Sequence, residues 1–132
     1  MLDQITPSKN SKIYDLGCGD GKILFQIESK FGIPGIGYEL SLLPYLISKL
    51  KTLLLKYKTK IYFQNLFNAN LNNADYIFIY LTPSIIQKVS NKILKECKLN
   101  TVIISNTFKV PNLKLIKTIA GTNSTKIYVY KK

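Results

Sequence analysis

The sequence predicts an α/β fold in which a mostly parallel, Rossmann-like sheet ends in an antiparallel hairpin. Residues 12–40 read as a strand, a glycine turn, a helix and a second strand. The run at 75–81 is strongly apolar, as in a parallel strand buried on both faces. Two final strand-like runs, 113–120 and 125–130, are joined by Gly-Thr-Asn-Ser, which is typical of a hairpin. We expect one domain, residues 1–132, with residues 1–11 as a short N-terminal lead.

The first strand, residues 13–16, runs into a turn with three alternate glycines, Gly17, Gly19 and Gly21. Because glycine has no Cβ, such a turn accepts positive φ angles and lets a ligand lie against the backbone. Apolar residues at three- and four-residue spacing then predict a helix that Gly32 ends. A second strand, residues 36–38, leads to Glu39, about twenty residues beyond the glycines, where an acid can bind ribose hydroxyls. These features predict a nucleoside-binding unit.

The glycine spacing separates two classes of nucleoside cofactor. Dinucleotide-binding folds use GxGxxG with a pyrophosphate at the helix N-terminus, whereas this chain has GxGxG. Asp15, two residues before the first glycine, would repel a pyrophosphate but suits a cationic ligand. Four of the seven acidic residues, Asp15, Asp20, Glu28 and Glu39, lie in this unit although the net charge is +12. We expect an acidic pocket for a cation, with Glu28 as a solvated surface charge outside it.

Helices and strands continue to alternate after Glu39. Ser41 and Pro44 suit the start of a helix. Its outward face is expected to carry Lys49, Lys51, Lys56 and Lys58, and its inward face Leu42, Leu43, Leu46, Ile47, Leu50, Leu53, Leu54 and Tyr57. A third strand, residues 60–64, is followed by Asn65 and a loop too short for a full crossover helix. A helix at 84–97 and a strand at 101–105 complete the pattern.

Composition excludes several classes of function. The chain has no histidine, which excludes Ser-His-Asp triads and His-ligated zinc, and its two cysteines have no metal-ligand spacing. No apolar run is long enough for a membrane span, and residues 1–10 lack the features of a signal peptide, so a cytoplasmic location is expected. All 19 basic residues are lysines spread along the chain, as drift in an AT-rich genome would give. The charge therefore supports a nucleic-acid partner only weakly, because arginine is the residue suited to bidentate recognition.

Two motifs, YDLGCGDGKIL at 14–24 and GIGYEL at 35–40, resemble motif I and the acidic second strand of the class I S-adenosylmethionine-dependent methyltransferases. Two shorter pieces, Leu-Thr-Pro-Ser at 81–84 and Ser-x-x-Phe at 105–108, point to one group among these enzymes. They resemble the small bacterial and archaeal protein-lysine methyltransferases related to the mitochondrial enzymes that modify ATP synthase subunit c and the adenine nucleotide translocase.

This resemblance implies S-adenosylmethionine as cofactor and a protein lysine as methyl acceptor. It places the cofactor at Asp15, Gly17, Cys18, Gly19, Asp20, Gly21, Glu39, Leu40, Asn65 and Leu66. It places an aromatic-lined acceptor channel at Tyr80, Thr82, Pro83 and Phe108. Base amino-methylation is disfavoured, because those enzymes have Asn/Asp-Pro-Pro-aromatic where this chain has Leu-Thr-Pro-Ser. The alternatives are a cofactor-binding module without transfer activity, suggested by the short lead, and an RNA methyltransferase. The sequence does not indicate an oligomeric state.

Overall fold

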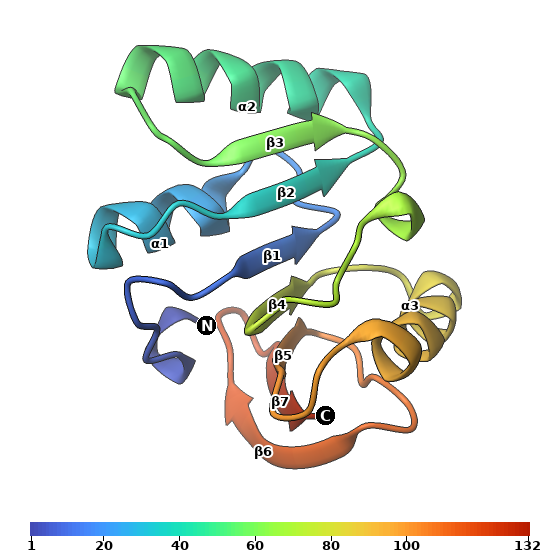
Figure 1. The fold of residues 1–132 in the computed structure, drawn as a ribbon. Helices are drawn as coiled ribbons and strands as arrows, with labels where there is room; N and C mark the ends of the chain where they lie inside the picture. Colours follow the sequence, from blue (N-terminus) through green and yellow to red (C-terminus); the bar gives the residue numbers. More distant parts are fainter.

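The computed structural model describes residues 1–132 as a seven-stranded sheet with helices on both faces (Figure 1). The strand order is β3-β2-β1-β4-β5-β7-β6. Strands β1 to β5 are parallel, and β7 lies antiparallel to both β5 and β6, so the predicted sheet and hairpin are confirmed. The strands are β1 (Ile13–Leu16), β2 (Ile36–Glu39), β3 (Lys60–Phe63), β4 (Tyr76–Ile79), β5 (Val102–Asn106), β6 (Lys114–Ala120) and β7 (Lys126–Lys131).

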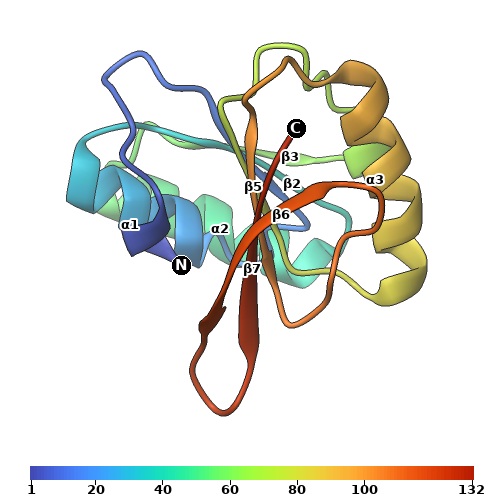
Figure 2. The same ribbon diagram turned by 90° about the horizontal axis from the view of Figure 1, so that it is seen from below.

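Three α-helices cover the sheet, α1 (Lys22–Phe31), α2 (Leu42–Leu55) and α3 (Pro83–Glu96). Figure 2 shows α1 and α2 on one face and α3 on the other. Two apolar clusters form the core, one under α1 around Phe78 and one under α3 around Ile77. Only a short 3-10 helix, Leu66–Asn68, lies between β3 and β4, as the loop length predicts. No helix combines the length and apolar character that crossing a membrane requires.

Helix α1 begins and ends at the predicted glycines. Gly21 precedes it with φ 79° and Gly32 follows it with φ 70°, both in the left-handed region that favours glycine. The amide of Gly32 donates to the carbonyl of Glu28 at 2.8 Å and closes the last turn. Leu24 and Ile27 of α1 are fully buried on the side of the helix that faces the sheet, so the apolar spacing correctly identified the inward face.

Helix α2 contradicts the predicted orientation. Ser48 is its only buried residue, and the helix packs on β2 and β3 through this side. Tyr45, on the same side, contacts Phe63 of β3 with ring centroids 5.2 Å apart. The prediction failed because apolar residues surround most of this helix, so spacing alone did not select a face. Tyr57 is half-buried, as expected, but the other residues assigned to the inward face are exposed: Leu42, Leu43, Leu46, Ile47, Leu50, Leu53 and Leu54.

Glu28 is also not the solvated charge that we expected. Its carboxylate accepts hydrogen bonds from the backbone amides of Lys58 and Thr59 at 2.7 and 2.9 Å, and from the Thr59 hydroxyl at 2.7 Å. The Thr59 hydroxyl also accepts from the amide of Gly35 at 3.1 Å. Glu28 therefore ties α1 to the segment that enters β3. Sequence spacing could not show this, because the partners lie about thirty residues away.

Candidate active site

The glycine turn lies at the carboxyl ends of the central strands, where α/β sheets bind ligands. The amides of Gly17 and Cys18 both donate to the carbonyl of Tyr38, at 2.9 and 3.0 Å, which ties the turn to β2. The three turn glycines have φ angles of 82°, 55° and 79°, which side chains rarely adopt. A Cβ built on Gly19 would meet no protein atom within 4 Å, so a ligand can approach this backbone.

Glu39, at the end of β2, lies beside this turn. One carboxylate oxygen accepts from the amide of Gly19 at 2.7 Å, and the other accepts from the amide of Ser41 at 2.6 Å. An ionised carboxylate offers about four lone-pair sites, so further donors can bind. Glu39 therefore fixes the turn and keeps capacity for a ligand hydroxyl.

Asp15 is the most unusual group in the site. The residue is only 5% exposed, and no protein group donates a hydrogen bond to its carboxylate. Because no fully buried side-chain oxygen of the protein lacks a partner, the Asp15 oxygens must reach the cavity that this residue lines. Burial, together with the nearby charge of Glu39, raises its pKa to about 7. A carboxylate largely removed from water and without a protein donor is unfavourable in its ionised form, and a cation bound in this cavity would favour that form.

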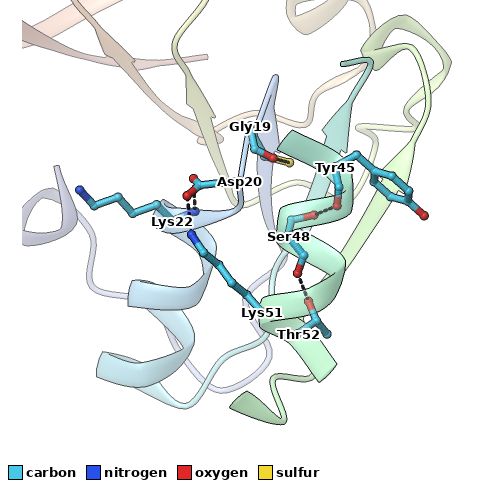
Figure 3. A network of polar contacts seen from close by, with 8 residues as sticks. Gly19, Asp20, Lys22, Tyr45, Ser48, Lys51 and Thr52 are labelled. Atoms are coloured by element: carbon cyan, nitrogen blue, oxygen red, sulfur yellow. Dashed lines mark hydrogen bonds and ion pairs between the residues drawn. The ribbon is translucent and has the colours of Figure 1, made fainter. Parts of the chain in front are cut away.

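Asp20 is held by contacts on both sides of the turn (Figure 3). It forms an ion pair with Lys51 of α2 and accepts from the amide of Lys22 at 3.4 Å. The Lys51 contact lowers the pKa of Asp20. The Cys18 thiol is buried, and burial, with Asp15 nearby, raises its pKa, so it stays protonated at neutral pH. Lys51 was expected on the outward, solvated face of its helix, but it pairs with Asp20 of the glycine turn, so this expectation is wrong.

Two cavities meet at this point, and both are lined by Gly17 and Tyr80. Their volumes are about 400 and 380 Å³, within the size range of small-molecule sites. The first is also lined by the predicted residues Asp15, Cys18, Gly19 and Asp20, and the second by Glu39, Leu40, Asn65 and Leu66. Gly21 lines neither, because it is buried at the start of α1. The sequence analysis missed the other residues that line these cavities, most of which lie at strand ends or in the turns and helix starts that follow them: Met1, Lys22, Ile23, Tyr38, Ser41, Gln64, Phe67, Phe78, Ile79, Leu81, Ile85 and Asn106.

The predicted acceptor residues are less closely grouped. Tyr80 lines both cavities and is 63% exposed. Thr82 and Pro83 are exposed at the start of α3, and Phe108 is exposed after β5; none of the three lines either cavity. The Ser105 hydroxyl donates to the carbonyl of Phe108 at 2.6 Å, so this part of Ser-x-x-Phe forms a turn. The structure brings only Tyr80 of this set to the cofactor cavities.

Comparison with known proteins agrees with this geometry. Residues 15–117 match the family described as ANTKMT methyltransferase domain. A protein-lysine N-methyltransferase of Saccharolobus islandicus is 24% identical over 136 residues, covering 98% of this chain and 84% of that protein. The adenine nucleotide translocase lysine N-methyltransferase of Mus musculus is 24% identical over 123 residues; the match covers 90% of this chain but only 52% of the mouse protein.

A solved structure has the same fold. An RNA methyltransferase from Salinibacter ruber, in complex with S-adenosyl-L-homocysteine, superposes with a TM-score of 0.90 at 21% identity. The match covers 98% of this chain and 86% of that chain. The strand order and this likeness define a Rossmann-like methyltransferase fold. The chain belongs to the ANTKMT methyltransferase domain family, which confirms the resemblance seen in its motifs.

Proposed function

We propose that this protein is an S-adenosylmethionine-dependent methyltransferase whose acceptor is the ε-amine of a protein lysine. The observation that carries the proposal is the Asp15 carboxylate, buried at the glycine turn without a protein hydrogen bond. S-adenosylmethionine has an ammonium and a sulfonium, which a buried carboxylate can stabilise. A cofactor with a negatively charged pyrophosphate would instead be repelled.

The two cavities fit the two ends of such a cofactor. In our assignment, Asp15 and Asp20 lie at its amino-acid end, against the backbone from Gly17 to Asp20. Glu39 holds the ribose, and Leu40 and Leu66 enclose the adenine. The amide oxygen of Asn65 accepts from the amide of Phe67 at 3.0 Å and has a second lone pair for the adenine amino group.

Methyl transfer needs no nucleophilic side chain of the enzyme. Bound S-adenosylmethionine would supply a methyl group on a positively charged sulfur, and the neutral lysine nitrogen held in the channel would be the group that accepts this methyl. The products are S-adenosylhomocysteine and a methylated amine. Alignment of the two reactants can lower the activation free energy by about 7–11 kcal/mol. Before attack the lysine ammonium must lose its proton to solvent, and an apolar channel favours this step because desolvation lowers the pKa of the ammonium.

We assign the acceptor channel to Tyr80, Thr82, Pro83 and Phe108. Tyr80 is the best supported, because it lies where the two cavities meet. The lysine acceptor is supported by two relatives whose names include lysine N-methyltransferase. The cytoplasmic location and the single domain stay predictions.

A transfer assay tests the proposed acceptor. The purified protein is incubated with methyl-labelled S-adenosylmethionine, at a concentration near the wild-type Kd, and a whole-cell extract, with the weakly binding Asp15→Asn variant as the control. We expect the label to be removed by protease but not by nuclease. Acid hydrolysis of the labelled product should release methyl-lysine. Nuclease-sensitive label would instead support an RNA acceptor, which the basic charge and the RNA methyltransferase fold neighbour make the second candidate. If no label is transferred although the protein binds the cofactor, the protein would be a cofactor-binding module without transfer activity.

A further inference from the structure

Helix α2 presents an apolar face to solvent. All seven of its leucines are between 52% and 75% exposed; Leu55 lies on the side of Ser48, and the other six are Leu42, Leu43, Leu46, Leu50, Leu53 and Leu54. At one residue per 100°, these six fall on one side of the helix, opposite the buried Ser48. Figure 3 shows Lys51 reaching Asp20 of the glycine turn, while the hydroxyls of Ser48 and Thr52 donate to carbonyls of α2 itself. An exposed apolar surface of this kind marks a place of contact.

Lysines that form no ion pair lie beside this face and beyond the end of α2. Lys49 and Lys56 flank the leucines, and the chain from residue 40 to residue 74 contains no acidic residue. Beyond the end of α2, Lys58 and Lys60 join Lys9 and Lys12 around a cavity of about 430 Å³. None of these six lysines forms an ion pair; the four ion pairs of the protein use other lysines.

We infer that α2 is a docking surface for an anionic lipid membrane. An interfacial helix buries its apolar side at the headgroup boundary and keeps its lysines among the anionic headgroups. A second copy of this chain fits less well, because both partners would bring the same unpaired lysines and a net charge of +12. The charge of the surface therefore selects an anionic, apolar partner. Exposed Leu40 and Phe67 line the adenine cavity close to the start of α2, so docking would bring this cavity to the membrane surface.

Vesicle co-sedimentation of the full chain tests the inference. We expect binding to phosphatidylcholine vesicles that contain phosphatidylglycerol, and much weaker binding to phosphatidylcholine alone. Leu53→Asn should reduce this partitioning several-fold, and a Leu46→Asn, Leu50→Asn, Leu53→Asn variant by on the order of tenfold or more. Leu99→Asn is the matched control, because Leu99 is as exposed as Leu53, 76% against 75%, but lies outside α2. Circular dichroism checks that each variant is folded.

A second pair of variants tests the charge. Lys49→Gln with Lys56→Gln should weaken binding to the anionic vesicles by on the order of tenfold, because each lysine near such a surface contributes to attraction. Lys88→Gln with Lys95→Gln removes the same charge from exposed positions of α3 and should have little effect. Equal losses from both pairs would overturn the docking surface, since attraction would then be a property of net charge alone.

Two further results would overturn the inference. One is absence of vesicle binding by the folded protein. The other is a dimer in sedimentation equilibrium that Leu53→Asn dissociates, which would assign this face to a second copy. The inference does not depend on the proposed function, because cofactor affinity is measured separately by calorimetry and vesicle binding can persist without it.

Discussion

The proposed cofactor end and the proposed acceptor end of the site differ in how completely the fold builds them. At the cofactor end, backbone hydrogen bonds hold the glycine turn to β2 and to Glu39, and Asp15 lies buried beside it. At the acceptor end, Tyr80, Thr82, Pro83 and Phe108 are all exposed, and only Tyr80 reaches the cavities.

This difference indicates where specificity is decided. A site whose backbone is already fixed pays little ordering entropy when it binds, so cofactor affinity should depend on single groups of this chain. An exposed acceptor end makes few contacts of its own, so the substrate protein must supply part of the enclosure. Substitutions at the first end should change cofactor affinity, and those at the second end should change only the rate.

The largest expected effect is at Asp15. Asp15→Asn removes the buried charge that faces the cationic end of the cofactor, and we expect the Kd for S-adenosylmethionine to rise by about 10- to 100-fold, the loss of a charged hydrogen bond. Calorimetric titration measures it. An unchanged Kd would remove Asp15 from the cofactor site.

The same variant should stabilise the free protein at high pH. Because burial raises the pKa of folded Asp15 to about 7, above its unfolded value of 3.8, the folded state holds this proton more tightly. Protonated Asp15 therefore contributes to the free energy of unfolding. This contribution is fully present below about pH 4 and is lost as the pH rises through 7, and it amounts to at most about 4 kcal/mol. We therefore expect Asp15→Asn to raise Tm at pH 8 more than at pH 5, measured by thermal unfolding without cofactor. A lower Tm at pH 8 would contradict the unfavourable burial.

Glu39 comes next. Glu39→Ala removes the proposed ribose contact, and the Kd for S-adenosylmethionine should rise roughly tenfold or more. Glu28→Ala is a matched control, because Glu28 also accepts two backbone amides from a neighbouring segment but lines neither cofactor cavity. Both variants should lower Tm, whereas only Glu39→Ala should weaken binding. If Glu39→Ala and Glu28→Ala bind S-adenosylmethionine with the same affinity, Glu39 does not hold the ribose.

A pH titration gives a similar or smaller effect. Below pH 7 Asp15 is increasingly protonated in the free protein, whereas the cationic ligand binds its ionised form. Affinity for S-adenosylmethionine should therefore fall roughly tenfold between pH 7.5 and pH 6. Asp15→Asn should show a flatter profile over this range. A wild-type profile as flat as that of the variant would mean that the Asp15 pKa does not control binding.

The smallest expected effect is at the acceptor end. Phe108→Ala shortens the exposed wall of the proposed channel and should lower the methylation rate by a few-fold while the cofactor Kd stays unchanged. Single-turnover transfer and calorimetry measure the two quantities. A raised Kd for the cofactor in this variant would place Phe108 at the cofactor end of the site and contradict its assignment to the acceptor channel.

The sequence predicted most of the cofactor end and less of the rest. Gly17, Gly19 and Gly21 need positive φ, and few residues satisfy that need, so the motif determines the turn. The face of α2 could not be predicted, because it depends on the pairing of Lys51 with Asp20 and the contact of Tyr45 with Phe63. Such contacts join segments that are distant in the sequence, and hydrophobic spacing carries no information about them.

The most direct test of the account is a calorimetric titration of the folded protein with S-adenosylmethionine, with NAD as the control. We predict micromolar binding of S-adenosylmethionine, its strong weakening in Asp15→Asn, and no response to NAD. Folded protein that binds no S-adenosylmethionine, or that binds NAD equally well, would contradict the assignment of both cavities to this cofactor.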